Sequence, residues 1–464
     1  MNTQAPPPRF LRPAFAADAR AEWEALARAR PDIEFIDAML PDLAGSFRGK
    51  RFPVAEAARL FESGMQIPRS IYLMDSRGEM TDTFGCGVGD GDPDGTAWPV
   101  PGTLSPVWGE ARAQVLMTLR DEAGAPDAAE PRAALERVLD RFAELKLTPV
   151  AALELEFYLI DRARDALGAP LAPISPRDGR RETAPSVYGM DDLDRYAGFL
   201  AALNDAAETQ RIPLSAVSKE YAPGQFEANL RHQSDARAAA DHAMFLKQIV
   251  KACARAQGFD ATFMAKPYAG QPGSGLHIHL SLIDENGRNV FDGGGEDGSP
   301  SLRQAIAGLQ ASMPQSMALF APNVNSYRRF EPGMFAPVNR RWGVNNRSVG
   351  LRVPLGPGEA RRVEHRVAGA DANPYFALAA VLAGAHHGLA AKRDPGPPAP
   401  GNVSRARDAE LPLTLEEALA TLEHASVLAS YLGSETLALY GETKRIEAAR
   451  VRRAITPSEY EWYL

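Results

Sequence analysis

The sequence predicts a protein of two domains in which β-strands alternate with α-helices, in an α/β or α+β arrangement. The chain has 464 residues, enough to form a large core and more than one domain. Strand patterns of period two alternate with clear helix patterns at 192–208 and 235–257. The stretch DEAGAPDAAEP at 121–131 has the composition of a linker between a smaller first part and a larger second part.

The first part consists of an N-terminal arm with the first helix, 1–29, followed by a small domain over 30–125. The opening MNTQAPPPRF is Pro-rich and lacks the apolar run of a signal peptide. Short runs of strand-like composition predict strands at 33–37, 47–53 and 70–74. Apolar periodicity predicts helices at 18–30 and 55–64. The Gly- and Asp-rich stretch 85–102 is expected to be a long irregular loop.

The second part, 126–464, opens with a helix that begins at RAALERVLDRFAEL. The most apolar run, PYFALAAVLAGA at 374–385, is too short to span a bilayer and predicts a core helix. GGGEDGSP at 293–300 predicts a surface loop. The tail from Leu413 is expected to form two helices.

The charge and cysteine content narrow the class of protein. Lys and Arg number 51 against 59 Asp and Glu, and the net charge of -8 argues against a nucleic-acid binder or an anionic-membrane binder. Cys86 and Cys253 are the only cysteines, so no disulfide framework is indicated. These features predict a cytoplasmic protein that binds neither nucleic acid nor membrane.

The stretch LELEFYL at 153–159 carries two carboxylates inside an apolar strand pattern. Because side chains alternate along a strand, Glu154 and Glu156 share one face. Two anions at this spacing repel each other and resist burial, so one must take up a proton or a cation must neutralise them. The cation could be a bound divalent metal ion or a pair of arginines.

Three further stretches place polar groups at period two on one face of a predicted strand. They are GQFEANL at 224–230 (Gln225, Glu227, Asn229), GLHIHLSL at 275–282 (His277, His279, Ser281) and RRVEHRV at 361–367 (Arg362, Glu364, Arg366). Each alone could be an amphipathic edge strand or a surface salt-bridge ladder. In a curved sheet these groups can converge, and several Glu with a single His favour Mg²⁺ or Mn²⁺ over tetrahedral zinc.

Two other stretches are rich in arginine. NVNSYRRF at 323–330 supplies Arg328 and Arg329, and NNRSVGLRVP at 345–354 supplies Arg347 and Arg352. Surface arginine is the alternative interpretation of each. The chain has no GxxxxGK[ST] loop, so arginines and metal ions would have to hold the phosphates of any bound nucleotide.

These motifs, in this order, resemble those of the class I glutamine synthetases and their amine-ligating relatives, the γ-glutamylamine synthetases. The likeness runs from about residue 30 to the C-terminus and includes ELEFYL, EYAPGQFEANL, KPYAGQPGSGLHIHLSL and PNVNSYRRF. It implies an α+β fold: a β-grasp domain over 30–125, then a catalytic domain over 126–464 with a curved antiparallel sheet flanked by helices. It also implies a dodecamer of two hexameric rings, with active sites between neighbouring subunits.

The resemblance implies two metal sites and an amino-acid site. The ligands of the metal nearer glutamate would be Glu156, Glu220 and Glu227, and those of the metal nearer the ATP phosphates would be Glu154, His277 and Glu364. Arg329 and Arg366 would hold the glutamate carboxylates and the transferring phosphoryl group, with the backbone of Gly273 beside the amino acid.

The same likeness assigns the nucleotide and amine contacts. Arg347 and Arg352 would contact phosphate, while His279 and Ser281 would contact the nucleotide. Asp75 would help to bind and deprotonate the amine in a neighbour's site. The implied reaction uses ATP and two or more Mg²⁺ or Mn²⁺ ions: the γ-carboxylate of L-glutamate attacks ATP, and an amine displaces phosphate from the acyl phosphate.

The sequence departs from the glutamine synthetase pattern at four points, and the departure at Phe335 concerns the second substrate. Phe335 stands where the family has a Glu that takes a proton from ammonium, so the predicted substrate is an organic amine, a polyamine or a small alkylamine. Pro272 replaces an Asn, Glu359 replaces a Lys, and 391–411 lacks a Tyr for adenylylation. The alternatives are a true glutamine synthetase that uses ammonia, a silent structural relative, and a ligase for another acid.

Overall fold

The N-terminal domain is built on a mixed sheet of six strands. The computed structural model describes residues 12–464 except 88, 122, 294, 296 and 297. The sheet has the order β2-β1-β6-β4-β3, with β5 beside β6, and β1 and β6 are parallel. The strands are β1 (Phe35–Pro41), β2 (Phe47–Pro53), β3 (Met65–Pro68), β4 (Asp94–Pro99), β5 (Ser105–Pro106) and β6 (Arg112–Arg120). Helices α1 (Ala16–Ala29) and α2 (Ala57–Ser63) pack together through Trp23 and Phe61, whose rings stack with centroids 5.7 Å apart.

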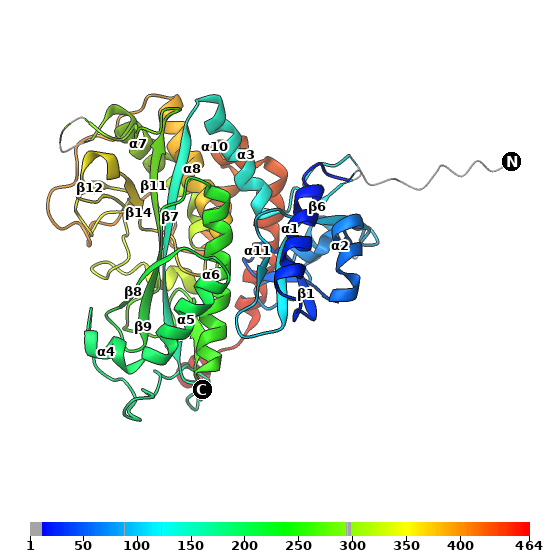
Figure 1. Cartoon of the computed structure of the whole chain (residues 1–464). Coiled ribbons are helices and arrows are strands. Elements are labelled where there is room, and N and C mark those ends of the chain that lie inside the picture. Colours follow the sequence, from blue (N-terminus) through cyan, green and yellow to red (C-terminus); the bar gives the residue numbers. More distant parts are fainter. Residues whose placement is uncertain (1–11, 88, 122, 294, 296–297) are drawn as a thin grey trace.

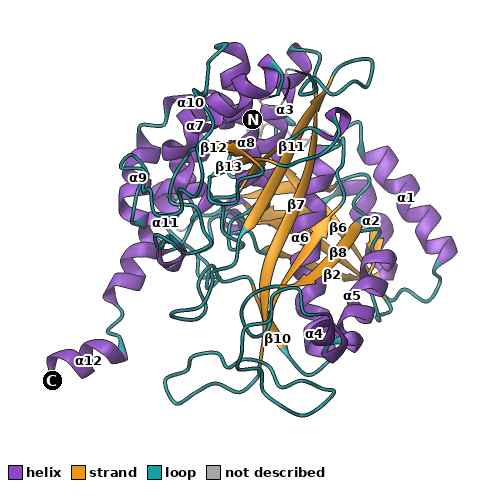
Figure 2. Ribbon diagram, turned by 90° about the vertical axis from the view of Figure 1, so that its left-hand side faces the viewer, coloured by secondary structure: helices purple, strands orange, loops and turns teal. Residues whose placement is uncertain are grey.

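The second domain contains an eight-stranded, mostly antiparallel sheet. Its order is β12-β13-β14-β11-β7-β9-β8, with β10 paired to β7, and only β12 and β13 run parallel. The strands are β7 (Thr148–Ile160), β8 (Leu214–Lys219), β9 (Gln225–Leu230), β10 (Asp260–Thr262), β11 (Leu276–Ile283), β12 (Trp342–Val344), β13 (Leu351–Val353) and β14 (Val363–His365). Figure 2 shows the long β7 crossing the domain beside β11. The predicted α+β class is confirmed.

Helices lie between this sheet and the N-terminal domain (Figure 1). They include α3 (Pro131–Glu144), α5 (Ala197–Thr209) and α6 (Ala236–Ala256). Helix α7 (Pro300–Phe320) packs on α8 (Pro374–Ala390) and is seen at the upper left of Figure 1, and the short α4 (Met190–Arg195) lies below. The core helix predicted at 374–385 is confirmed, since nearly every residue of α8 is buried. In the part of the chain that the structure describes, no helix is long and apolar enough to cross a membrane.

The C-terminal tail forms four helices, so the expectation of two was wrong. They are α9 (Leu415–Glu423), α10 (Ser426–Leu432), α11 (Ser434–Arg453) and α12 (Pro457–Tyr463). Gly433 separates α10 from α11 with a φ of +96°, a conformation that glycine tolerates best. Figure 2 shows α12 projecting away from the rest of the molecule.

Two expectations for the N-terminal domain were also wrong. The strand predicted at 70–74 is a 3₁₀ helix, Arg69–Tyr72, which follows Pro68 directly. The loop predicted at 85–102 contains β4, because the apolar end of that stretch pairs with β6 while the Gly-rich start stays irregular. Part of the predicted loop 293–300 lies outside the described residues. Further 3₁₀ turns are Val54–Glu56, Thr83–Gly85, Val324–Arg329 and Gly358–Ala360.

Candidate active site

The four strands singled out in the sequence are neighbours in the sheet, in the order β14-β11-β7-β9. Their register places the polar groups opposite one another. Glu156 pairs with Glu227 across β7 and β9, and Glu154 pairs with His277 across β7 and β11. His279 pairs in turn with Glu364 across β11 and β14. The predicted convergence is therefore confirmed, because residues of one parity on adjacent strands share one face.

His277 lies at the centre of this acidic cluster. Its Nδ1 is 3.4 Å from Glu154 Oε2, 3.6 Å from Glu227 Oε2 and 4.0 Å from Glu364 Oε1. Its Nε2 is 4.0 Å from Glu156 Oε1. One imidazole is thus surrounded by four carboxylates.

Two overlapping groups have ligand atoms within 4.8 Å of one another. One contains Glu154, Glu227 and His277, and the other contains Glu154, His279 and Glu364. Both groups share Glu154, and the second includes His279, which the family likeness assigned to the nucleotide. This arrangement differs from the expected division of the ligands, in which Glu156 and Glu220 joined Glu227.

Burial and mutual repulsion act strongly on the carboxylates. Burial, together with the charges of Glu154 and Glu156, raises the pKa of Glu227 to about 9. Burial and the charge of Glu156 likewise raise the pKa of Glu220 to about 7, which indicates that Glu220 faces the same cluster. Although burial opposes it, hydrogen bonding from His277 and His279 holds the pKa of Glu154 well below its usual range.

Arginines neutralise the β14 side of the cluster. The guanidinium of Arg352 lies 2.7 Å from one oxygen of Glu364, and Arg366 pairs with the other oxygen. Although burial opposes it, Arg366 and the nearby histidines lower the pKa of Glu364 to about 2. Arg362 Nε donates to His279 Nδ1 at 3.0 Å, which leaves Nε2 of that ring directed at Glu154, 3.0 Å away.

The cluster fits divalent metal ions. Without a metal ion, the protein reduces the repulsion between these carboxylates by keeping Glu227 protonated beside an ionised Glu154. A bound dication would supply the positive charge in place of that proton. The donor set of carboxylate oxygens with one or two imidazoles suits Mg²⁺ or Mn²⁺. Neither Glu154 nor Glu156 has an arginine within ion-pair distance among the described residues; their basic neighbours are His277 and His279, so the metal ion stays the prediction for LELEFYL.

Gly273 and Arg329 lie together beside the cluster. A Cβ on Gly273 would come within 2.5 Å of Ala265 O and of Arg329 Cγ, so only glycine fits there. Arg329 is buried and donates to Val367 O at 2.7 Å and to Arg366 O at 3.4 Å. Tyr158 Oη of β7 donates a hydrogen bond to Pro272 O at 2.7 Å, and this bond fixes the loop that precedes β11.

The other predicted nucleotide contacts surround the same face. Ser281 follows His277 and His279 along β11 at the same parity. Arg347 is partly exposed and its Nη1 is 3.4 Å from Tyr188 Oη. Although burial opposes it, the interaction with Tyr188 raises the pKa of Arg347, and the charges of Glu364 and Glu227 contribute in the same direction.

Phe335 lies in an exposed turn and meets Tyr221. The two ring centroids are 5.4 Å apart, and both side chains are solvent-accessible, at 61% for Phe335 and 39% for Tyr221. Tyr221 directly follows the candidate ligand Glu220 in the chain, which links the aromatic pair to that ligand. Sequence reasoning overlooked Tyr221; an aromatic residue in a turn beside a carboxylate ligand was the available signal.

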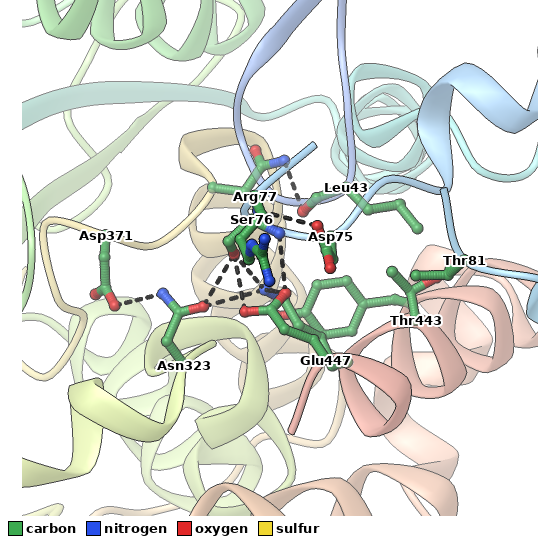
Figure 3. A network of polar contacts seen from close by, with 12 residues as sticks. Leu43, Asp75, Ser76, Arg77, Thr81, Asn323, Asp371, Thr443 and Glu447 are labelled. Atoms are coloured by element: carbon green, nitrogen blue, oxygen red, sulfur yellow. Dashed lines mark hydrogen bonds and ion pairs between the residues drawn. The ribbon is translucent and has the colours of Figure 1, made fainter. Parts of the chain in front are cut away.

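Asp75 is not brought to this cluster within the chain. Its side chain is 1% exposed, forms an ion pair with Arg450 of α11, and accepts hydrogen bonds from the backbone nitrogens of Arg77 (3.0 Å) and Glu79 (2.9 Å). Figure 3 shows the polar network around Asp75, which includes Ser76, Asn323 and Glu447. Arg450 was also overlooked, because its partner is 375 residues away in the chain.

Comparison with known proteins finds similarity over the part of the chain that carries these residues. The family model described as the glutamine synthetase catalytic domain matches 128–463. The chain is 43% identical to γ-glutamylputrescine synthetase of Escherichia coli (strain K12) over 94% of this chain and 92% of that protein. It is 33% identical to γ-glutamylethanolamide synthetase of Streptomyces coelicolor (93% and 92% covered) and 32% identical to a glutamate–isopropylamine ligase of Pseudomonas sp (91% and 93% covered).

Two solved structures are similar to this one over nearly the whole chain. A structure of GmaS in complex with ADP superposes with a TM-score of 0.82 at 30% sequence identity, covering 95% of this chain and 98% of that one. A GmaS structure without ligand gives a TM-score of 0.81 at 31% identity, with 94% and 98% covered.

Proposed function

Because the chain belongs to the glutamine synthetase family, we propose that it joins the γ-carboxylate of L-glutamate to an organic amine with ATP as the energy source. The observation that carries this proposal is the pairing of a carboxylate cluster built for dications with an aromatic residue, Phe335, at the amine side. Relatives that cover more than nine tenths of the chain are named for putrescine, ethanolamine-derived and isopropylamine products.

The family uses ATP and divalent metals, and this chain offers six groups to hold the ions: Glu154, Glu156, Glu220, Glu227, His277 and Glu364. His279, which lies in one of the two close groups, is a seventh. Bound Mg²⁺ or Mn²⁺ would neutralise charge on the phosphoryl oxygens. Mg²⁺ and Mn²⁺ both prefer oxygen ligands, so this set of ligand atoms suits either ion.

The protein's own groups would orient glutamate and ATP. Arg329 and Arg366 supply fixed positive charge at the edge of the cluster, and the missing side chain at Gly273 leaves its backbone open to the amino acid. Arg347 and Arg352 can contact the phosphates, with Ser281 further along β11. Attack of the γ-carboxylate on the γ-phosphorus would release ADP and give an acyl phosphate; the amine would then displace phosphate and lose a proton.

Phe335 and Tyr221 would receive the organic part of the amine. Two aromatic faces can pack against an alkyl chain and attract an alkylammonium group, whereas ammonia has no carbon to bury. A Phe cannot act as the base for ammonium. The pair therefore favours a polyamine or a small alkylamine.

Asp75 is proposed to act on the amine only in an assembly, where a neighbour's site can approach it. In a dodecamer of two hexameric rings, the exposed edge of the loop that carries Asp75 would face an adjacent subunit. Although burial opposes it, the backbone hydrogen bonds and Arg450 lower the pKa of Asp75, so the carboxylate stays ionised; an amine would have to displace Arg450 to pair with it. A cytoplasmic location stays a prediction.

A phosphate-release assay tests the proposal. The enzyme is supplied with L-glutamate, Mg-ATP and a panel of amines that includes putrescine, ethanolamine, isopropylamine and ammonia, and the amide product is identified by mass. We expect kcat/KM for at least one organic amine to exceed that for ammonia. Turnover with ammonia alone would identify a true glutamine synthetase, and no turnover with any amine would identify a silent relative.

A further inference from the structure

The turn between β8 and β9, residues 220–224, carries two residues on which the proposed function depends. Glu220 is a candidate metal ligand, and Tyr221 belongs to the aromatic pair at the amine side. Glu220 N donates to Gln225 O at 2.9 Å, which closes the turn. Gln225 Nε2 also donates to Gly273 O at 3.2 Å. The shape of this turn therefore sets where Glu220 and Tyr221 point, and it is tied to the loop beside the amino-acid site.

A buried lysine fastens this turn from the opposite face of the sheet. Lys219 is the last residue of β8, and Ser218 before it pairs with the candidate ligand Glu227. Because side chains alternate along a strand, Lys219 lies on the face opposite the carboxylate cluster. Its side chain is fully buried, and its Nζ donates to Ala222 O at 2.6 Å and to Glu220 O at 3.1 Å. One ammonium group thus holds two carbonyl groups of the turn.

The counterion of Lys219 comes from the long loop between β7 and α4. Glu182 Oε2 is 3.7 Å from Lys219 Nζ and accepts a hydrogen bond from Gly224 N at 2.7 Å. Its side chain is itself buried. Gly224 has a φ of +70°, and a Cβ there would come within 2.6 Å of Leu159 O, so glycine is required at this close approach. Glu182 therefore holds the far end of the same turn.

The rest of the loop that carries Glu182 lies along the turn. Ser186 N donates to Tyr221 O at 3.2 Å, and Tyr188 N donates to Lys219 O at 3.0 Å. Among the described residues, Glu182 is the only carboxylate within ion-pair distance of Lys219. The backbone on both sides of Tyr221 is therefore fixed by this loop, and the ion pair is the buried charged contact between the two segments.

The energy of such a pair argues for a role in alignment. Taking both charges out of water costs free energy that their attraction offsets only in part, and two apolar side chains of similar size would fill the same volume without that cost. What Lys219 and Glu182 add is direction, because hydrogen bonds to two carbonyl groups and one N–H fix the path of the turn.

We propose that Lys219 and Glu182 are positioning residues, and that this buried ion pair aims the Glu220 carboxylate at its metal ion and the Tyr221 ring at the amine. The inference rests on the proposed function, which gives Glu220 and Tyr221 those roles. Lys219 itself contacts neither metal nor substrate, since it lies on the other face of the sheet. Removing a group that orients a metal ligand weakens metal binding by about ten- to a hundredfold.

Manganese titration of the full-length protein by calorimetry tests the pair without any need for activity. The wild type should bind two ions per chain, and Lys219→Met should bind one of them more weakly by about tenfold or more. The double variant Glu182→Gln, Lys219→Met buries no uncompensated charge, so in urea denaturation it should recover much of the stability that Lys219→Met loses. It should not recover the manganese affinity, because the ammonium that holds the turn is still missing.

Kinetics separate alignment from a simple loss of stability. In both variants the KM for the best organic amine should rise by about tenfold, while the KM for ATP changes by less than about twofold. The reason is that Glu154, His277 and Glu364, the ligands expected nearer ATP, lie outside this turn. Arg132→Met is the matched control, since it breaks a buried ion pair with Asp241 (3.1 Å) between α3 and α6. It should lower stability and leave manganese affinity and the KM for the amine unchanged.

Two outcomes overturn the proposal. They are manganese affinity in Lys219→Met equal to that of the wild type, and recovery of manganese affinity together with stability in the double variant. If Lys219→Met does not fold, the affinity of the double variant decides alone. A wild type that binds no manganese overturns the proposed function as well, whereas wild-type amine turnover with unchanged manganese binding in the variants overturns this inference only.

Discussion

Glu227 and Glu156 face each other across two strands, and burial together with the charges of Glu154 and Glu156 sets the electrostatics at Glu227. Neither carboxylate has an arginine within ion-pair distance among the described residues, and His277 is their nearest basic group. A carboxylate in this position holds a proton until a stronger positive charge arrives. The raised pKa of Glu227, about 9, therefore marks a carboxylate at which a bound dication would replace a proton.

Phe335→Glu should shift substrate preference toward ammonia. A carboxylate there would attract ammonium and accept its proton, and it would remove the aromatic face from Tyr221. The ratio of kcat/KM for ammonia to that for the best organic amine should rise by about tenfold or more. Phe335→Leu keeps the apolar surface without the charge and serves as the control. An unchanged ratio in Phe335→Glu would remove Phe335 from the amine site.

Gly273→Ala should weaken glutamate binding with little effect on the KM for ATP. The added Cβ would lie 2.5 Å from Arg329 Cγ, so the arginine must move. We expect the KM for glutamate to rise by about tenfold, measured at saturating amine. Gly270→Ala is not a neutral control, because its φ is +71°; Ala269→Ser in the same loop is preferred. A normal KM for glutamate would show that this contact is unimportant.

At the scale of the element, period-two alternation predicted the site well. Glu154 and Glu156 on 153–159, Glu227 on 224–230, His277 on 275–282 and Glu364 on 361–367 converge as expected, because alternation fixes the face of every residue once strands pair. The order of the strands could not be obtained this way. It depends on contacts between segments far apart in the chain, as does the pairing of His279 with Glu364.

The metal-free protein should lose stability as pH rises. The folded-state pKa values of Glu220 and Glu227, about 7 and about 9, lie above their unfolded value of 4.5, so the folded state binds more protons between these limits. Unfolding free energy should therefore fall, by on the order of 1 kcal/mol per pH unit, from pH 5 toward pH 9. Urea denaturation with a chelator measures this slope. Saturating Mn²⁺ or Glu227→Gln should flatten it, and a rising slope without metal would contradict the account.

The helix α11 should depend on its link to the Asp75 loop. Arg450→Gln leaves the buried Asp75 carboxylate with only backbone donors, and we expect a loss of about 2 kcal/mol, since Arg450 is itself partly exposed. Arg452→Gln, at another position of α11, removes a surface ion pair with Glu416 of α9 and should cost less than about 1 kcal/mol. Chemical denaturation of both variants compares them. Equal decreases in unfolding free energy for the two variants would show that the buried Arg450–Asp75 ion pair contributes no more than a surface ion pair.

At the scale of the whole molecule, the sequence predicted an α+β chain with a smaller first sheet and a larger second one. The two sheets comprise strands from Phe35 to Arg120 and from Thr148 to His365, on either side of the expected boundary near 125. The C-terminal helices were undercounted because the breaks between them are short: two residues separate α9 from α10, Gly433 alone separates α10 from α11, and three residues separate α11 from α12. Contacts between distant segments, such as Asp75 with Arg450, leave no local pattern in either segment.

The dodecamer is a prediction from family likeness, and it can be measured. A dodecamer would have a mass of about twelve times 50.1 kDa by sedimentation equilibrium. Removing α12 by ending the chain at Ala454 tests whether this projecting helix, with its exposed Trp462, contributes to assembly. We expect the truncated protein to form smaller species. A wild-type monomer would contradict both the assembly and the proposed use of Asp75 across subunits.

The central claim is that carboxylate and imidazole groups from β7, β9, β11 and β14 bind a pair of dications. Anomalous X-ray scattering from crystals grown with Mn²⁺ tests it most directly. The account predicts two manganese peaks on either side of His277, within coordination distance of the carboxylates of Glu154 and Glu227. A map without manganese at this cluster, in crystals that hold the ion elsewhere, would contradict it.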